Sequence, residues 1–474
     1  MAFPTHPLPA DTIMARLAEL RAHDVPWREG RLLAGIYDPG AETRTTIQAA
    51  YSAFLSENAL YPNFFPSLLR IERDVVAAMA ELLRGDGAVG NCTSGGTESI
   101  LLAVKAARDH ARATRPELTA PEIILPQTAH AAFHKACHYL GVRPVVTPIE
   151  PTSFRADLPA MAAAITPQTI MLVASAPCYS HGVIDPIPAI AALARERGLL
   201  CHVDACVGGI QLSVMRRMGY SLPDFDFSVP GVTSISVDLH KYGYAAKNCS
   251  AILYHTPDLR RHALFCSSAT TGYAVINPTV LSTRSGGPLA GAWAAIHAIG
   301  ETGYQQIVRE TMACTAELIA AVRSVEGLRV LGAPEMCMFA FAAEDLNIFE
   351  LDDAMARRGW LLQPQLSKGA SPANLHVSVH QGTVGHADAF TTALRESVAE
   401  VRAGPGVGDV AALQAEVLEL MARPGPETFA RVAALAGLTP GQMPTGFARI
   451  NTVLNLLPEA VVDALLVEYL NSIY

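Results

Sequence analysis

A lysine at the end of an apolar run is the residue of this chain best suited to covalent chemistry. Residues 233–237 have the composition of a β-strand, and the polar turn that follows places Lys241 beside His240. An amine withdrawn from water loses its charge more readily and can then attack a carbonyl carbon near neutral pH. Lys241 could therefore carry a Schiff base, although a lysine in such a turn more often simply caps a buried strand.

A glycine-rich segment just before a helix-like stretch is suited to hold an anion. Residues 93–99 read Thr-Ser-Gly-Gly-Thr-Glu-Ser, with Gly95, Gly96 and Thr97 at the centre. Paired glycines let backbone N–H groups approach an anion, and Thr97 adds a hydroxyl at the positive end of the helix dipole. The segment matches neither the dinucleotide pattern GxGxxG nor the P-loop, which disfavours a nucleotide. A glycine turn that caps a helix would look the same.

A carboxylate follows another apolar run. Asp204 lies in the segment His-Val-Asp-Ala-Cys-Val-Gly-Gly at residues 202–209. A buried carboxylate costs free energy unless a cation pairs with it, and a protonated pyridine nitrogen is such a cation. An aspartate that caps a helix is the alternative, but the two glycines leave room for a flat ligand.

A histidine lies where a strand-like stretch gives way to a helix. His130 could stack on an aromatic cofactor, although a lone histidine is more often structural. His134 follows four residues later, but HxxxH without a third ligand is a weak metal signal, so we expect no metal.

In chain order, these features match the parts of one cofactor. The glycine-rich segment suits a phosphate, His130 a ring face, Asp204 a ring nitrogen and Lys241 an aldehyde carbon. Pyridoxal 5′-phosphate (PLP) carries all four groups, so we expect a PLP-dependent enzyme.

The elements that must position these residues alternate along the chain. Helical periodicity separates short apolar runs, which indicates a mainly parallel sheet covered by helices on both faces. The expected strands span 122–126, 144–148, 169–175, 199–203, 234–237 and 251–254, and the expected helices 99–112, 131–140, 158–165 and 187–197.

The chain divides into four predicted parts. We expect an N-terminal arm for dimerisation (1–60), a large PLP-binding domain (61–300), a smaller α+β domain (301–400) and a C-terminal helical extension (401–474). The Gly/Pro-rich stretch at 402–409 has the composition of a linker.

Composition limits the kinds of binding partner and the cellular compartment that we expect. The 474 residues carry 35 basic and 44 acidic side chains, a formal charge of −9, which disfavours nucleic acid as a partner. Nine scattered cysteines without a CxxC pair read as reduced, buried thiols. There is neither a signal peptide nor an apolar run near the ~20 residues of a membrane span, so we expect a cytoplasmic protein.

The sequence resembles the fold-type I PLP enzymes of the group II decarboxylase superfamily, and within it the sphingosine-1-phosphate lyase family. The strongest match is Asp-Leu-His-Lys-Tyr-Gly-Tyr-Ala-Ala-Lys at residues 238–247. Further matches lie at 93–109, 130–133, 175–182, 202–209 and 283–287, and the resemblance covers about residues 30–400.

This resemblance implies roles for individual residues. Lys241 would form the Schiff base, Asp204 would hold the pyridine nitrogen, and His130 and Tyr179 would complete the catalytic set. The implied cofactor-binding residues are Gly95, Gly96, Thr97, His130, Asp204, Asp238, His240, Lys241, Ser285 and Gly286, and the implied substrate-binding residues are Tyr37, Tyr61, Tyr179 and Lys247.

The resemblance also implies a homodimer with shared active sites. Tyr37 of the partner subunit would reach across, and the loop at 282–287 would lie at the interface near the phosphates. Three departures affect the substrate side, since Tyr61 replaces a common histidine, Asn248 a glycine and Ser180 a proline.

The implied activity is retro-aldol cleavage of a phosphorylated long-chain amino alcohol to a fatty aldehyde and phosphoethanolamine. Lys247, six residues after Lys241, suits a substrate that bears its own phosphate. Tyr179, Lys241 or a cofactor phosphate oxygen could move the proton. The alternatives are an amino-acid decarboxylase of the same superfamily and a catalytically silent binding protein with the same fold.

Overall fold

A seven-stranded sheet forms the centre of the larger lobe. The computed structural model describes residues 3–269, 271–406, 410–422, 428–437 and 446–473. Strands β2 to β6 run parallel, whereas β7 is antiparallel to both of its neighbours, β6 and β1, which confirms the mainly parallel sheet. The order is β1 (Val89–Thr93), β7 (Ser250–Tyr254), β6 (Ser234–Val237), β5 (Leu200–Asp204), β4 (Thr169–Ser175), β2 (Glu122–Pro126) and β3 (Arg143–Thr147).

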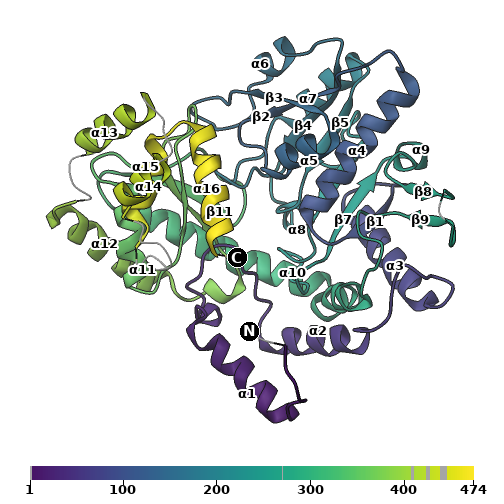
Figure 1. The fold of residues 1–474 in the computed structure, drawn as a ribbon, viewed down its shortest axis with the longest axis horizontal. Coiled ribbons are helices and arrows are strands. Elements are labelled where there is room, and N and C mark those ends of the chain that lie inside the picture. The colour runs from purple at the N-terminus through teal and green to yellow at the C-terminus, as the bar shows by residue number, and fades with distance from the viewer. Residues whose placement is uncertain (1–2, 270, 407–409, 423–427, 438–445, 474) are drawn as a thin grey trace.

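Helices cover both faces of this sheet (Figure 1). Side chains of β2 alternate between the faces, because Ile123 and Leu125 pack with α4 and α5 while Ile124 packs with α7. Buried strands covered on both sides explain the uninterrupted apolar runs. The covering helices are α4 (Gly96–Thr114), α5 (Ala132–Leu140), α6 (Leu158–Ala163), α7 (Ile187–Glu196) and α8 (Gly209–Arg217).

The smaller lobe has a sheet of its own. Its four antiparallel strands are β10 (Leu328–Val330), β11 (Met338–Ala343), β13 (Asn374–Ser378) and β12 (Gln363–Gln365), in that order. Helices α11 (Ile348–Arg357) and α12 (Ala387–Ala403) pack beside it, and α10 (Gly286–Arg323) runs between the lobes with a break in helical geometry at Gly300 (Figure 1).

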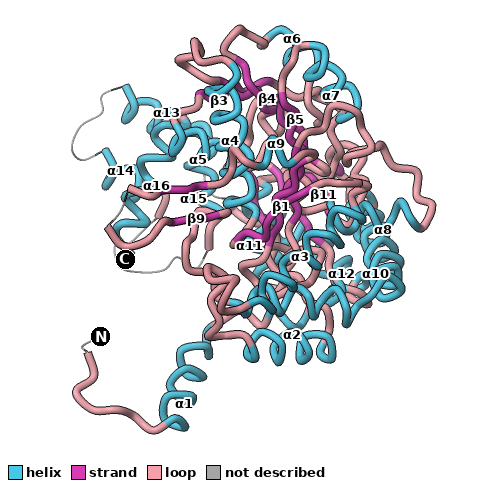
Figure 2. Tube along the Cα trace, turned by 90° about the vertical axis from the view of Figure 1, so that its right-hand side faces the viewer, coloured by secondary structure: helices cyan, strands magenta, loops and turns pink. Residues whose placement is uncertain are grey.

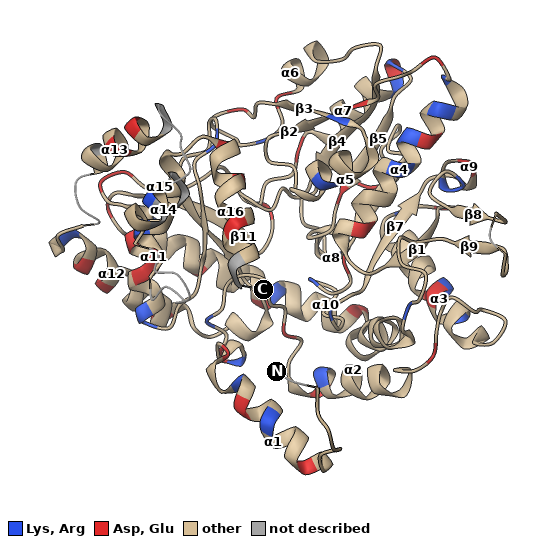
Figure 3. Ribbon diagram, viewed as in Figure 1, with Lys and Arg blue, Asp and Glu red and all other residues tan. Residues whose placement is uncertain are grey.

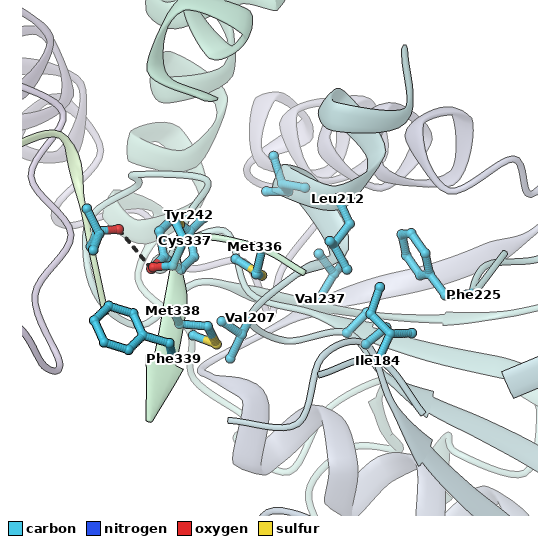
Figure 4. Packing of buried hydrophobic residues seen from close by; sticks show 14 of the residues in the cluster. Ile184, Val207, Leu212, Phe225, Val237, Tyr242, Met336, Cys337, Met338 and Phe339 are labelled. Atoms are coloured by element: carbon cyan, nitrogen blue, oxygen red, sulfur yellow. Dashed lines mark hydrogen bonds between the residues drawn. The ribbon is translucent and has the colours of Figure 1, made fainter. Parts of the chain in front are cut away.

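The two sheets share one apolar core. Val207, Leu212 and Val237 of the large lobe belong to the same cluster as Met336 and Phe339 of the small lobe (Figure 4). The small sheet is therefore packed against the edge of the large sheet where β5 and β6 end.

The remaining elements lie at the two ends of the chain and beside β1. Helix α1 (Ala10–Leu20) has no buried residue and projects from the body (Figure 2), while α2 (Ala41–Ala53) lies along α10. The C-terminal helices have their own apolar cluster. The other elements are α3 (Pro66–Leu82), α9 (Pro257–Arg260), β8 (Phe265–Ser267), β9 (Val275–Asn277), α13 (Val410–Ala422), α14 (Thr428–Leu435), α15 (Ala448–Leu456) and α16 (Glu459–Ile473).

Cysteines, charges and helix lengths bear on the compositional predictions. All nine cysteines are free and eight are buried, whereas Cys266 is exposed, so the prediction of buried thiols is wrong for that residue. Charged residues of both signs are interspersed over the helices (Figure 3). No helix within the described ranges is both long and apolar enough to cross a membrane.

Candidate active site

A cavity of about 320 Å³ opens where strands β1, β5 and β6 end. β1 runs in the same direction as β6, because both are antiparallel to β7, so their carboxyl ends meet at one edge of the sheet. Nine of the predicted residues line this cavity: Gly95, Gly96, Thr97, His130, Tyr179, Asp204, Asp238, His240 and Lys241.

Lys241 is paired with a buried carboxylate. Its Nζ lies 3.0 Å from Oδ2 of Asp238, and Ser250 donates a hydrogen bond to the other oxygen of Asp238. Burial alone would lower the pKa of Lys241, but the Asp238 carboxylate raises that pKa above the ordinary lysine value. The premise that this amine loses its charge through desolvation is therefore wrong for the chain by itself, because the ion pair outweighs burial.

The glycine-rich segment forms a turn that a side chain would fill. Gly95 is the N-terminal cap of α4, and Thr97 lies exposed in the first helical turn. A Cβ on Gly96 would lie 2.8 Å from the Cys206 Sγ and 2.9 Å from both carboxylate oxygens of Asp238. Only glycine fits here, so the backbone of this turn stays open towards the cavity.

Asp204 ends β5 with one oxygen fixed. The Cys206 backbone N–H (3.0 Å) and the Ser236 hydroxyl (3.3 Å) both donate to Oδ1. These two contacts orient the carboxylate and leave Oδ2 for a cationic partner. Behind it, the fully buried His202 contacts the hydroxyl groups of Ser234 (2.9 Å) and Ser236 (3.3 Å).

His130 and Tyr179 also line the cavity. His130 stands just before α5, where its Nδ1 accepts a hydrogen bond from the Ala132 N–H at 3.1 Å. Tyr179 follows β4, and burial raises the pKa of its phenol while the charge of Lys241 lowers it. The structure thus brings together the four predicted catalytic residues.

Tyr37 and Lys247 lie beside Lys241 of the same chain. The ring of Tyr37 packs edge-on against Tyr242 at 4.8 Å between ring centroids. Lys247 Nζ donates to the Gly35 carbonyl at 2.9 Å and stands over the Tyr37 ring at 5.1 Å. Burial, and then the charge of Lys241, lowers the pKa of Lys247. The prediction that Tyr37 comes from a partner subunit differs from this arrangement, in which residues 35–37 reach the site within one chain.

Three predicted residues lie away from the cavity of their own chain. Tyr61 contacts Phe64 and Tyr273. Ser285 caps α10 and donates a hydrogen bond to the Leu55 carbonyl at 3.0 Å, and Gly286 fits closely against Leu68. A single chain does not bring them to Lys241, and their proposed place at a subunit interface stays a prediction.

Comparisons with known proteins agree with this geometry. Residues 36–344 match the pyridoxal-dependent decarboxylase conserved domain, and residues 387–472 match the C-terminal putative HTH domain of pyridoxal-dependent enzymes. A sphingosine-1-phosphate lyase of Arabidopsis thaliana is 39% identical over 83% of this chain and 73% of its own. The sphingosine-1-phosphate lyase structure from Burkholderia pseudomallei superposes with a TM-score of 0.81 at 34% identity, covering 90% of this chain and 98% of that chain. The chain belongs to the sphingosine-1-phosphate lyase family.

A more distant relative represents the decarboxylases. The probable L-aspartate decarboxylase of Pyrococcus abyssi is 32% identical over 76% of this chain and 90% of its own. The lyase family and this decarboxylase share the pyridoxal-dependent fold, so PLP is the cofactor of the chain, which is a PLP-dependent lyase.

The residues of this lyase-family site fit PLP. Thr128 Oγ1 lines the cavity and has no hydrogen-bond partner within the described part of the chain, so it can serve a bound group. Gly96 leaves its space open for an anion at the start of α4, and Asp204 keeps Oδ2 for a ring nitrogen. Sequence reasoning missed Thr128, although its position two residues before His130 at a strand end could have indicated it.

Glu98 is a second residue that sequence reasoning missed. Its carboxylate accepts hydrogen bonds from the backbone N–H groups of Ser94 (2.6 Å), Val280 (2.7 Å) and Leu281 (3.3 Å). It thereby ties the anion-binding turn to a loop about 180 residues away. Nothing in the sequence indicated this role, because only the fold shows that the Glu98 carboxylate binds backbone N–H groups of a distant loop.

One departure from the lyase family has a conformational explanation. Asn248, which stands where a glycine is usual, has φ +68°. Glycine adopts this left-handed conformation freely, and asparagine tolerates it better than most residues. The substitution therefore preserves the backbone path between Lys247 and β7.

Proposed function

We propose that this chain cleaves a phosphorylated long-chain amino alcohol of the sphingosine-1-phosphate type. The products are a fatty aldehyde and phosphoethanolamine, formed by retro-aldol cleavage of the bond between C2 and C3. One observation carries the proposal: the cavity joins Lys241 and Asp204 to Tyr179, and a second amine, Lys247, lies within electrostatic reach of Lys241. The family supports it, because relatives from several kingdoms are sphingosine-1-phosphate lyases.

PLP, when bound, supplies an electron sink for the bond that breaks next to the substrate amine. The residues of the chain set its position. Lys241 would hold the aldehyde carbon, the start of α4 and His240 would hold the phosphate, and the free oxygen of Asp204 would keep the ring nitrogen protonated. His130 lies where it can cover the face of the ring.

Tyr179 is our candidate for taking the proton from the C3 hydroxyl. It lines the cavity, and the charge of Lys241 lowers the pKa of its phenol against the effect of burial. Burial is the larger influence and keeps the pKa of this phenol above its ordinary value, while the nearby cation stabilises the phenolate form, which is the form that accepts a proton.

Lys247 is our candidate for binding the substrate phosphate. Its amine is partly exposed, and one of its donors is occupied by the Gly35 carbonyl, which leaves two donors for phosphate oxygens. Tyr37 lies beneath the amine and limits its orientation.

A homodimer with shared active sites is part of this proposal. Large exposed apolar side chains occur in two segments that contact each other through Tyr61 and Tyr273, and Ser285 bonds to Leu55 in the first of them. They include Leu55, Phe64, Leu69, Phe265, Ile276, Val280 and Leu281. A contiguous surface of this kind is typical of a protein interface. Light scattering of the purified protein would test the dimer.

The expectation that the protein does not bind nucleic acid stays a prediction. The segment that matches the putative HTH domain, residues 387–472, carries ten acidic and five basic side chains, a charge of −5 that would repel a phosphate backbone. The cytoplasmic location expected from the sequence likewise stays a prediction.

Product identification tests the activity. Purified, PLP-loaded protein is incubated with a phosphorylated sphingoid base, with its dephosphorylated form and with a panel of amino acids. We expect aldehyde and phosphoethanolamine from the phosphorylated base and much slower turnover of the dephosphorylated one. Release of carbon dioxide from an amino acid without any aldehyde would instead establish the decarboxylase, the second candidate, which the Pyrococcus relative favours.

A Lys241→Ala variant tests the silent-protein alternative. The wild-type protein should show the visible absorbance of lysine-bound PLP together with turnover, and the variant should lose both. Cofactor absorbance without turnover of any substrate would support a silent binding protein.

A further inference from the structure

The ring of Tyr179 stacks on the ring of a histidine from the other lobe. The rings of Tyr179 and His376 stack with their centroids 4.1 Å apart and their planes 28° apart. Tyr179 follows β4 of the large sheet, whereas His376 lies in β13 of the small sheet and is fully buried. The orientation of the Tyr179 ring therefore depends on a contact between the two lobes.

A buried hydroxyl completes the contact. Ser378 stands two residues after His376 on the same face of β13, and its Oγ lies 2.7 Å from Nε2 of His376. Burial raises the pKa of Tyr179, and a hydrogen bond between the Ser378 hydroxyl and the phenol opposes that effect. Tyr179, His376 and Ser378 thus form a closed cluster: a stacked ring, an imidazole and a hydroxyl that joins them.

The surroundings of His376 fix how the hydroxyl points. Burial lowers the pKa of His376 to about 3, so the imidazole is neutral at the pH of the cell. Its Nδ1 has no hydrogen-bond partner of ordinary geometry among the described residues, although the Ser180 carbonyl is near enough to raise that pKa slightly. A buried N–H without an acceptor is costly, which favours the proton on Nε2. With the proton on Nε2, the imidazole donates to Ser378, and the Ser378 hydroxyl is free to donate to the Tyr179 oxygen, which is the direction that lowers the pKa of the phenol.

We propose that His376 and Ser378 are positioning residues for Tyr179, which set the orientation of its ring and stabilise the charge that develops on its oxygen. The inference rests on the proposed function in one respect, because it takes from that function the part of Tyr179 in proton transfer. Neither residue is among those that line the cavity, and each acts through Tyr179.

A double-mutant cycle tests the coupling. Ser378→Ala should lower kcat about tenfold with little change in KM, since about 1.4 kcal/mol corresponds to a tenfold change and is typical of such a hydrogen bond. In a Tyr179→Phe background the same Ser378→Ala change should alter kcat less than about twofold, because its partner is gone. The cycle uses whichever substrate the product assay identifies, so a wrong substrate assignment shows in the products and not in the coupling.

Ser371→Ala is the matched control. Ser371 is a buried serine in the same lobe whose hydroxyl lies 3.0 Å from the imidazole of the buried His181, but that imidazole stacks on Phe154 instead of Tyr179. It should leave kcat unchanged. A tenfold fall for Ser378→Ala in both backgrounds, or no fall in either, would overturn the proposal.

A titration without turnover provides the second readout. In cofactor-free protein, the ultraviolet difference between a protein and its Tyr179→Phe counterpart reports ionisation of Tyr179 alone. Ser378→Ala should raise the pKa of Tyr179, because the donor that stabilises the phenolate is lost, and Ser378→Cys should give a smaller shift. An unchanged Tyr179 pKa in Ser378→Ala would contradict the proposal even if Tyr179→Phe abolished turnover.

Discussion

The two sides of the cavity are built in different ways. On one side, Gly96, Asp204 and Lys241 each lie at or just after the end of a strand of the large sheet, and each lies within a short recognisable segment. On the other side, Tyr179 is supported by His376 and Ser378, about 200 residues further along the chain and in the other sheet.

This difference separates the residues that would hold the cofactor from those that orient Tyr179. Backbone geometry at strand ends places the cofactor side, so it depends mostly on local sequence. The tyrosine side depends on how the lobes pack. The turn after Lys241 is tied to the same packing, because the buried Tyr242 hydroxyl donates to the carbonyls of Cys337 (3.3 Å) and Val379 (3.0 Å). Figure 4 shows Tyr242 beside Cys337. Four predictions would sharpen or break the comparison.

Lys241→Ala should have the largest effect, a fall in kcat on the order of 1,000-fold, because no other group on the cofactor side can replace the amine. Lys247→Ala is the comparison, since we expect it to keep kcat and raise KM for the phosphorylated substrate about tenfold. Steady-state kinetics on both variants separates the roles. Equal losses of kcat would mean that Lys247 takes part in the chemistry.

The pH dependence of stability tests the histidine behind the cofactor side. Burial lowers the pKa of His202, behind Asp204, from 6.5 to about 4, with the Asp204 charge opposing this. Because the folded-state pKa is depressed, the unfolded chain binds the proton first, and stability present above pH 6.5 is lost as the pH falls to about 4. The shift corresponds to roughly 3 kcal/mol. Urea unfolding between these pH values should show the loss, and His202→Gln should reduce it. An identical slope in that variant would contradict the assignment.

Gly96→Ala tests the anion-binding turn. The added Cβ would meet the Cys206 sulfur at 2.8 Å and the Asp238 carboxylate at 2.9 Å, and overpacking of this kind costs about 1–3 kcal/mol. We expect PLP affinity, measured by absorbance titration, to fall about 10- to 100-fold. Gly291→Ala is the control, because its new Cβ would find its nearest neighbour at an ordinary 3.5 Å. Unchanged PLP binding in Gly96→Ala would remove the turn from the cofactor site.

Asn248→Ala should give the smallest effect. Alanine at φ +68° is strained by about 1 kcal/mol, a loss that chemical unfolding would measure, whereas Asn248→Gly should stay within about 0.5 kcal/mol of the wild type. If alanine is as stable as glycine here, the backbone conformation does not explain the departure from the family.

Much of the fold followed from periodicity. The six strands predicted for the large sheet occur within one residue at each end, because continuous apolar runs of this length suit strands covered on both faces. The edge strand β1 was missed. It reads Val-Gly-Asn-Cys-Thr, and its glycine is required by a close approach, since a Cβ on Gly90 would lie 2.3 Å from the Ile252 carbonyl oxygen in β7.

The sequence by itself determined the cofactor side. Residue types at strand ends, in chain order, indicate a phosphate cradle, a ring-nitrogen carboxylate and a Schiff-base lysine, because parallel strands bring their carboxyl ends to one edge whatever surrounds them. Only the tertiary structure decided the state of Lys241, which Asp238 keeps charged against burial. Only it placed Tyr37 beside Lys241 of its own chain and His376 behind Tyr179. These contacts join segments far apart in the chain, and local pattern carries no information about which distant surfaces pack together.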